Sequence, residues 1–341
     1  MPDVTFNLRA LTPVFIAGAD QTSAELRAPT FRGLMRYWQR ALVGGLAGTD
    51  ATGLQKVRQT EKDLFGATDT GSAVSIRVRA GTNEAREFTE RVSVRVGNTW
   101  QATGKGYLLW SMARSGRPEK GNVKPARWYF PPGTTFQVTL STHSGENTKL
   151  KQAVATFWLL THLGGIGSRS RRAAGSLAAQ PEKSGSTDFP FQTPASAAVL
   201  KQQIEQGIVL ARDLYSREER RIREAQFDIL APGFCRIWIL QDEQPWPNAE
   251  IAMQKLGERL QDYRSRVPIG SRKVFGLPLM PIIRDKRRAS PLLLRVAELQ
   301  GNRYVGIAVL FKTTGSDVRG EDYDVIEKWV NEFRGKLEVT L

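Results

Sequence analysis

The chain has 341 residues, of which 40% are hydrophobic, and its 49 lysines and arginines outnumber its 34 aspartates and glutamates. This length predicts two domains, and the apolar content excludes a globally disordered chain. The formal charge of +15 indicates a polyanionic partner. A single cysteine, Cys235, excludes a disulfide framework and a thiolate zinc site, and it fits a reducing, cytoplasmic compartment. No uninterrupted apolar run reaches the roughly 18 residues of a membrane span, so no spanning helix is expected. The basic residues lie in loops and within globular patterns, and not on one long amphipathic helix, so we expect no membrane partner.

Six segments of the first half show the periodicity of regular elements: strands at 4–11, 72–80, 134–142 and 173–179, and helices at 27–45 and 149–163. Their order is β-α-β-β-α-β, the plan of ferredoxin-like and RNA-recognition modules. Residues 81–133 are irregular and contain many Gly, Lys and Arg, and we interpret them as an insertion with one possible strand at 91–97. The first predicted domain therefore covers residues 1–180.

A segment rich in Pro, Ser and Gly, at 180–196, predicts a linker, and a charged helical stretch follows at 197–225. The earlier plan then recurs, with strands at 234–240, 291–299, 303–312 and 336–341 and helices at 248–266 and 322–335. The strands at 291–299 and 303–312 are predicted to form a hairpin around "QGN". We expect a linker with a connecting helix at 181–233 and a second domain at 234–341.

The helix at 27–45 carries two different faces. At about 100° per residue, one apolar arc is predicted to pack in the core, and it consists of Phe31, Leu34, Met35, Trp38, Ala41 and Leu42. Arg32, Arg36 and Arg40 form a separate stripe, with Gly33 beside it. An outer helix face normally mixes charges of both signs, whereas this one offers only arginines and Gln39. The stripe is thus a candidate RNA contact. Trp38 belongs to the core arc, and the alternative is that a base stacks on its ring.

The loop "HLGGIGSRSRRAAG" (162–175) interleaves glycines with arginines. Glycines let the backbone approach a phosphate closely, and arginines make bidentate phosphate contacts. The loop lacks the ending of a Walker loop, and it follows a helix, unlike the dinucleotide-binding fingerprint. A solvated surface loop is the alternative interpretation. We predict that RNA phosphates are bound at the following residues: Gly165, Gly167, Arg169, Ser170, Arg171 and Arg172.

Two further loops contribute candidate residues. The segment "IIRDKRRASPLLLRV" (282–296) leads into a strand, and we expect Lys286, Arg287 and Arg288 to line a groove; a solvated charge run is the usual alternative. The loop "GADQ" (18–21) offers Gln21 as an RNA contact. Its Asp20 could bind a metal, act in catalysis or accept hydrogen bonds in the turn.

Catalytic patterns are poor in this sequence. No Ser/His/Asp set is evident, and the two histidines, His143 and His162, are far apart in the chain. The carboxylates show no paired metal-ligand spacing. We therefore expect no enzyme activity, no cofactor and no bound metal.

Several segments, taken together, resemble a known family. They are "LTPVFIAGADQ", "ELRAPTFRGLMRYWQRALVGG", "EKDLFGAT", "GGIGSRSRRAAGSL", "VFGLP" and "RRASPLLLRV", and they occur in one order between positions 10 and 296. They are similar to the first RAMP subunit of the Cmr complex, the type III-B CRISPR effector. The chain departs from the family at Thr30 and Phe31, where the family tends to show Ser and an aliphatic residue.

The resemblance implies an α+β fold of two ferredoxin-like, RRM-like domains facing each other across a basic cleft. It also implies a non-catalytic RNA-binding subunit at the head of the complex, near the 3′ end of the guide RNA, which helps to capture single-stranded target RNA in antiviral defence. Its partners would be guide RNA, target RNA and other RAMP subunits. In the repeated backbone subunit of such complexes, an aspartate in the loop after the first strand cuts the target with a metal. Asp20 lies in a comparable loop, so a metal-dependent ribonuclease is the alternative, and an RNA-binding protein unrelated to CRISPR is a weaker third.

Overall fold

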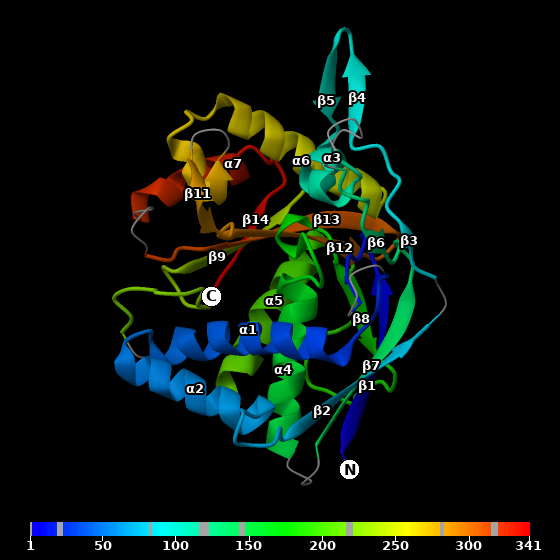
Figure 1. Ribbon diagram of the computed structural model, residues 1–341. Helices are drawn as coiled ribbons and strands as arrows, with labels where there is room; N and C mark the ends of the chain where they lie inside the picture. Colours follow the sequence, from blue (N-terminus) through cyan, green and yellow to red (C-terminus); the bar gives the residue numbers. More distant parts are fainter. Residues whose placement is uncertain are drawn as a thin grey trace.

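The computed structural model describes residues 2–18, 23–81, 84–115, 123–142, 147–215, 221–279, 283–314 and 320–341 (Figure 1). Its first sheet has the strand order β2 (Val74–Ala80), β7 (Thr135–Thr142), β1 (Asp3–Ala10) and β8 (Leu177–Pro181), and all neighbouring strands are antiparallel. Side chains alternate between core and solvent along β1 and β7, as the sequence pattern predicts.

The second sheet repeats the arrangement of the first. Its strand order is β12 (Leu292–Leu299), β13 (Arg303–Phe311), β9 (Cys235–Leu240) and β14 (Leu337–Val339), again antiparallel throughout. When the strands are numbered within each half, both sheets follow the order 2-3-1-4. The predicted α+β class is thus confirmed, and the repeated order of elements corresponds to a repeated sheet topology.

The main helices are α1 (Ala28–Ala47), α2 (Ala51–Phe65), α3 (Gly104–Leu109), α4 (Asn147–Leu163), α5 (Ala197–Asp213), α6 (Ala249–Arg266) and α7 (Asp324–Val330). Short 3-10 turns are η1 (Trp110–Met112), η3 (Ser170–Arg172), η4 (Ser271–Phe275) and η5 (Gly320–Tyr323). The sequence analysis missed α2, although its signals are present. Asp50 caps the helix by accepting from the Gly53 amide at 2.8 Å, and Gly66 ends it.

Several predicted boundaries were wrong. The helix expected at 197–225 ends at Asp213, and the strand expected at 173–179 begins only at Leu177. The strand starts later than predicted because Arg169 and Ala173 both adopt the left-handed conformation, at φ 63°, on either side of η3. Three two-stranded sheets complete the fold: β3 (Arg86–Glu87) with β6 (Trp128–Tyr129), β4 (Ser93–Val96) with β5 (Thr99–Ala102), and β10 (Leu277–Leu279) with β11 (Ile283–Arg288).

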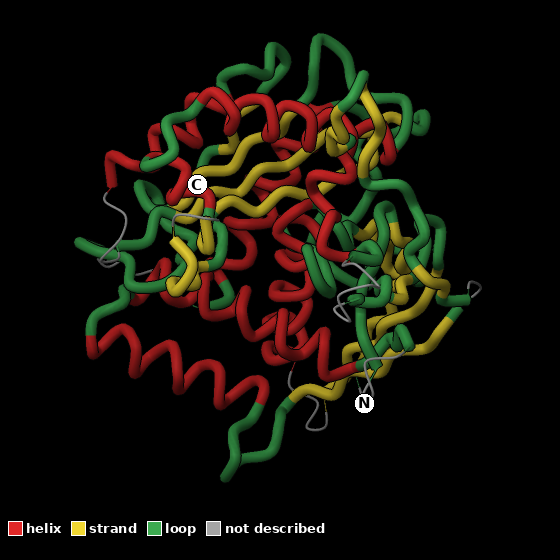
Figure 2. Tube along the Cα trace, turned by 45° about the horizontal axis from the view of Figure 1, so that its top comes forward, coloured by secondary structure: helices red, strands yellow, loops and turns green. Residues whose placement is uncertain are grey.

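The second sheet is covered by helices on both faces (Figures 1 and 2). Along β9, Ile237 and Ile239 join the core that contains α1 and α4, whereas Trp238 and Leu240 join the core that contains α6 and α7. The helices α1 and α4 of the first half therefore lie between the two sheets, whereas α3 packs on α6 on the other face of the second sheet. The opposite face of the first sheet is polar, and there the Gln137 amide donates to Asn7 at 2.9 Å. The two halves thus share one continuous core.

Candidate nucleic-acid interface

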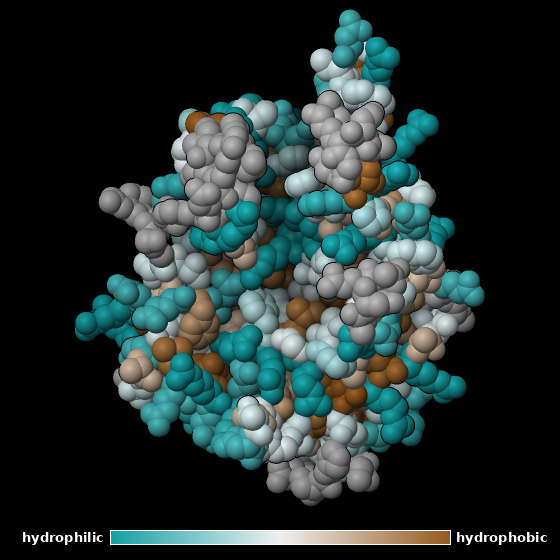
Figure 3. Space-filling view, viewed as in Figure 1, coloured by the Kyte–Doolittle hydropathy of each residue, from teal (hydrophilic) through white to brown (hydrophobic). Residues whose placement is uncertain are grey.

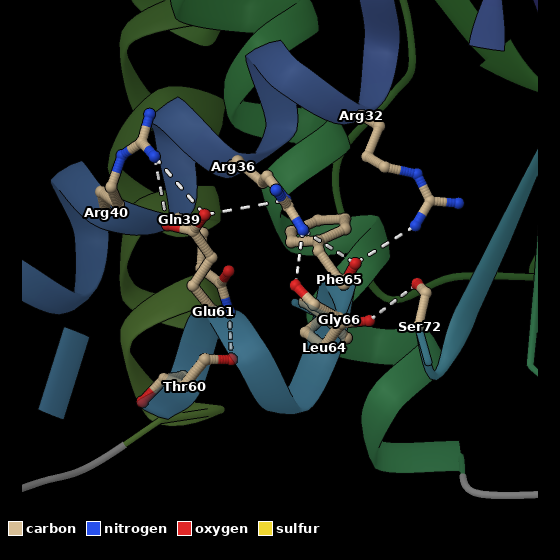
Figure 4. A network of polar contacts seen from close by, with 10 residues as sticks. All are labelled: Arg32, Arg36, Gln39, Arg40, Thr60, Glu61, Leu64, Phe65, Gly66 and Ser72. Carbon is tan, nitrogen blue, oxygen red and sulfur yellow. Dashed lines mark hydrogen bonds and ion pairs between the residues drawn. The ribbon is translucent and has the colours of Figure 1, made fainter. Parts of the chain in front are cut away.

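The arginine stripe of α1 faces the C-terminal end of α2 (Figure 4). Arg36 donates to the backbone carbonyls of Phe65 and Gly66, at 2.9 and 2.5 Å, and Arg32 donates to the carbonyl of Phe65 at 3.3 Å. The last carbonyls of a helix lack intrahelical donors and carry partial negative charge, so these guanidinium groups stabilise the end of α2. The stripe therefore has a structural task in addition to any contact with a ligand.

The outer part of the stripe is neutralised by one acid. Glu61 of α2 lies 3.6 Å from the Arg36 Nε atom and 3.2 Å from an Arg40 Nη atom. The Glu61 side chain is 17% exposed, while that of Arg40 is 44% exposed. Glu61 is thus more buried than Arg40, whose guanidinium group is presented outward, while that of Arg36 points at the end of α2.

The glycine–arginine loop joins the two halves of the molecule. Arg169 donates to the carbonyl of Leu108, and Arg172 donates to the Phe275 carbonyl at 3.1 Å and to Ser290 Oγ at 3.1 Å. The Ala173 amide donates to the carbonyl of Leu294 in β12 at 2.9 Å. Arg169 and Arg172 therefore point inward and hold backbone carbonyls of distant segments.

Burial and the positive charges of Arg169 and Arg264 lower the pKa of Arg172 to about 9. Among the described residues, the acceptors of this guanidinium group are carbonyl oxygens and the Ser290 hydroxyl, and none is a carboxylate. Both inward arginines thus direct their charge at groups within the protein.

Arg171 is the member of this loop that reaches an open surface. Its guanidinium group lies 2.8 Å from the Asp228 carboxylate, donates to the Ser290 carbonyl at 2.6 Å and lies over the Tyr37 ring. Tyr37 also donates its hydroxyl to Asp228 at 2.7 Å. Burial alone would lower the pKa of Arg171, but Tyr37 and Asp228 outweigh it and raise the pKa, so this arginine remains charged.

These elements border one open cleft of about 960 Å³, between α1 and α2 on one side and the segments 226–228 and 288–291 on the other. Its basic lining residues are Arg36, Arg40, Arg58, Lys62, Arg171 and Arg288. Two acids, Glu61 and Asp228, face them. Within the described part of the chain, the exposed side chain of Arg58 forms no hydrogen bond or ion pair. Hydrophilic residues cover much of the face that carries α1 and α2 (Figure 3).

The cleft brings together one part of each predicted basic motif and leaves other parts out. The α1 stripe contributes Arg36 and Arg40, the glycine–arginine loop contributes Arg171, and the run before β12 contributes Arg288. Arg32 and Gly33 do not line it, and Gly33 faces open space. Sequence reasoning missed Arg58 and Lys62, because α2 was not predicted, and it missed Asp228.

Two candidate RNA contacts need correction. Trp38 is 1% exposed and packs against Phe311 of the second sheet, with the ring centroids 6.2 Å apart, so the alternative of base stacking on Trp38 was wrong. A Cβ atom on Gly164 would lie 2.6 Å from the Trp38 Nε1 atom, so this glycine makes room for the ring. Gly165 is buried as well, and its backbone does not face solvent.

The remaining candidates are placed as follows. Gly167 is half-buried at φ 80° against the Phe15 carbonyl, and Ser170 is half-buried in η3. Arg287 is exposed on β11, and Lys286 lies on the same strand. Asp20, Gln21 and His143 lie outside the described residues.

Groups that could support metal or acid–base chemistry are scarce in the described ranges. No three His, Cys, Asp or Glu residues there come together closely enough to hold a metal ion. His162 is stacked on Trp158 with a centroid distance of 4.5 Å, and burial and the charge of Arg295 lower its pKa to about 3. Its imidazole is thus neutral at ordinary pH. Among the described helices, none is both long enough and apolar enough to cross a membrane.

The sequence model of the RAMP superfamily matches residues 7–178, which include the second half of β1, the α1 stripe and the glycine–arginine loop. The chain belongs to the RAMP superfamily. It is 28% identical over 340 residues to the CRISPR system Cmr subunit Cmr1-1 of Pyrococcus furiosus, covering 93% of this chain and 90% of that protein. It is 32% identical over 192 residues to subunit Cmr1-2 of the same organism, covering 53% of this chain and 96% of that protein.

Solved structures of Cmr1 and of a Cmr complex contain chains that share the fold of this chain. The crystal structure of Cmr1 from Pyrococcus furiosus in its apo form matches with a TM-score of 0.68 at 21% identity, covering 99% of this chain and 98% of that one. A chain in the cryo-EM structure of the type III-B Cmr-beta complex bound to cognate target RNA matches with a TM-score of 0.58 at 14% identity, covering 97% and 100%. These relatives confirm the resemblance to a Cmr RAMP subunit that was predicted from the sequence motifs.

Proposed function

We propose that this RAMP protein is a non-catalytic RNA-binding subunit of a type III-B CRISPR effector in the cytoplasm, and that its basic cleft holds guide or target RNA. The observation that carries the proposal is the convergence of three basic motifs, distant in sequence, on one open cleft. The Cmr1 relatives and the solved Cmr-beta complex with target RNA support the assignment to such an effector. Other RAMP subunits are its proposed protein partners.

The cleft chemistry suits a phosphate backbone. Guanidinium groups recognise phosphates through bidentate hydrogen bonds, and Arg40 and Arg58 are exposed on adjacent helices that both border the cleft. The cleft presents no exposed tryptophan for base stacking. We therefore expect RNA binding with little sequence preference, dominated by phosphate contacts.

We further propose that each half is a ferredoxin-like unit, with boundaries at 1–180 and 234–341, joined by the linker and helix of 181–233. The repeated strand order of the two sheets supports this division. The helix α5 of the linker segment contacts both halves, because it packs on α4 and its Glu205 accepts a hydrogen bond from the Thr340 amide at 2.8 Å.

A binding titration with fluorescent single-stranded RNA tests the cleft. The double variant Arg40→Ala/Arg58→Ala removes two exposed cations, and each phosphate that the cleft no longer neutralises should reduce the log–log salt slope by about 0.7. The matched control is Arg334→Ala, an exposed arginine paired with Glu243 away from the cleft lining. Arg36 is a poorer choice for this test, because its removal would also disturb the end of α2. Equal affinities and equal salt slopes for the double variant and the control would refute the cleft assignment.

A further inference from the structure

Two tryptophans of the insertion between β2 and β7 are turned into solvent. Trp100 on β5 is 71% exposed, and Trp110 at the start of η1 is 59% exposed. In the described part of the chain, these are the two most exposed of the large hydrophobic side chains. A free indole ring leaves a large apolar area in water, and rings displayed in this way usually serve as contact surfaces.

The segment that carries these two rings is anchored by the packing of α3 on α6. The hairpin of β4 and β5 forms a sheet of its own and stands clear of the rest of the molecule (Figures 1 and 3). At its base, Thr103 caps α3 by accepting from the Gly106 amide at 2.9 Å, and the Lys105 amide donates to Gln254 of α6 at 2.9 Å. A Cβ atom on Gly257 would lie 1.9 Å from the Gly104 carbonyl oxygen, so α3 and α6 touch backbone to backbone.

Arg95 and Arg114 form no ion pair among the described residues, whereas Lys105 is paired with Glu90 and, at 3.2 Å, with Glu250. Between residues 91 and 115, the sequence has no Asp or Glu, and it has four cations: Arg91, Arg95, Lys105 and Arg114. Arg95 stands directly opposite Trp100 in the hairpin register, so both side chains leave the same face of the hairpin. The Arg95 guanidinium group donates only to the Gly97 carbonyl, at 3.2 Å, among the described residues. Arg114 is exposed and follows Trp110 by four residues.

We propose that the tryptophan surface, formed by Trp100 and Trp110 with Arg95 and Arg114, binds single-stranded RNA by stacking bases on the indole rings. The arginines bind the adjacent phosphates. This inference rests on the proposed RNA-binding function and adds a second, base-stacking contact to the phosphate-binding cleft. Stacking on aromatic rings is tolerant of sequence, because every base presents a flat face. The lack of an acidic partner for Arg95 and Arg114 among the described residues, and the pairing of a cation with a ring on one hairpin face, favour a nucleic acid over an apolar protein surface as the occupant.

The test separates base stacking from phosphate binding. Anisotropy titrations of the full chain use an oligouridylate and an abasic ribose-phosphate oligomer of equal length. The variant Trp100→Ala/Trp110→Ala should bind the oligouridylate at least about fivefold more weakly than the wild type does. It should bind the abasic oligomer as the wild type does, with the same salt slope, because every arginine that binds a phosphate is still present. Trp100→Phe should retain part of the difference between the two oligomers.

The controls keep this inference distinct from the cleft proposal. Val209→Ala removes an exposed apolar side chain from α5 and should change nothing. A stacking loss in the tryptophan variant together with normal binding by Arg40→Ala/Arg58→Ala would sustain the tryptophan surface and refute the cleft. Unchanged oligouridylate binding by the tryptophan variant would overturn the inference. In that case, failure of the variant to assemble with other effector subunits would identify the surface as a protein-docking site.

Discussion

The carboxylate of Asp228 lies 2.8 Å from the guanidinium group of Arg171 inside the basic cleft. Asp228 belongs to the segment that follows the connecting helix, whereas Arg171 belongs to the glycine–arginine loop, so the contact spans two distant parts of the chain. Tyr37 donates its hydroxyl to the same carboxylate oxygen. Under the proposed function, this carboxylate thus occupies the position next to Arg171 that a phosphate would take.

The first prediction concerns this internal competitor. Asp228→Asn removes a negative charge from the cleft but keeps an oxygen that can accept from Tyr37. We expect RNA affinity to rise by about fivefold at low salt, equivalent to about 1 kcal/mol, and the gain to shrink as salt screens the charges. Anisotropy titrations at two salt concentrations measure this effect.

The matched control for Asp228 is Glu338→Gln. Glu338 also pairs with an arginine, Arg236, at 2.8 Å, but it does not line the cleft. This variant should leave the RNA affinity unchanged. Weaker RNA binding by Asp228→Asn, with the fold intact, would mean that Asp228 organises Arg171 for binding and does not compete with the phosphate.

The second prediction concerns the inward arginines of the loop. Arg172→Ala leaves the Phe275 carbonyl and Ser290 Oγ without this donor and opens a cavity, so we expect a loss of about 1–3 kcal/mol in the free energy of unfolding. The RNA affinity of the folded variant should stay within about twofold of the wild type, since this side chain does not line the cleft. Urea unfolding and RNA titration measure the two quantities.

Two comparisons sharpen the test of Arg172. Arg172→Met restores most of the lost volume, so the stability that it fails to recover reports the missing hydrogen bonds. Ser170→Ala changes a half-buried neighbour and should shift the free energy of unfolding by no more than about 0.5 kcal/mol. If Arg172→Ala kept its stability but lost its RNA affinity, Arg172 would be shown to bind an RNA phosphate.

These outcomes show how far the sequence could specify the candidate interface. Period-two and helical patterns located most of the strands and the long helices, because burial on one face leaves that periodicity in the residues. The same patterns predict Trp38 in the apolar arc of its helix, and in the fold this side chain packs against Phe311. The targets of the loop arginines could not be predicted, because a backbone carbonyl and an RNA phosphate attract the same guanidinium group. Only the fold shows that Arg169 and Arg172 meet carbonyls, while Arg171 reaches the cleft.

The third prediction concerns His162 and pH. Its pKa of about 3 in the folded chain lies below the ordinary value of 6.5, so the unfolded chain binds the proton more readily between these two values. This contribution to stability is therefore complete above pH 6.5 and is lost as the pH falls toward 3. At about 1.4 kcal/mol per pH unit, the group should reduce the free energy of unfolding by about 2 kcal/mol between pH 7 and pH 5. Urea unfolding at the two pH values measures the loss.

The control for the pH effect is His162→Gln. A glutamine does not titrate in this range, so the part of the pH dependence that is due to His162 should disappear, even though the variant starts from a lower stability. Carboxylates elsewhere titrate below pH 5 for the most part and contribute equally to both proteins. If the free energy of unfolding fell equally in both proteins between pH 7 and pH 5, His162 would have the same pKa in the folded chain as in the unfolded chain.

The last prediction concerns catalysis. We expect that the isolated chain does not cut RNA and that Asp20→Ala leaves target cleavage by the assembled effector intact. A lone carboxylate makes a weak Mg²⁺ site, since the ion needs several oxygen ligands and keeps most of its water. In the described ranges, no group of carboxylates or histidines supplies those ligands, and the imidazole of His162 is buried. RNA phosphates could complete a site at Asp20, which is why the ribonuclease alternative needs a direct assay. The measurement is incubation of the purified chain with labelled RNA and Mg²⁺ or Mn²⁺, followed by the same assay on the complex that carries Asp20→Ala. Metal-dependent cuts by the wild-type chain that vanish in the variant would establish the nuclease. Loss of target capture without any loss of cutting would make Asp20 an RNA-positioning residue of its loop.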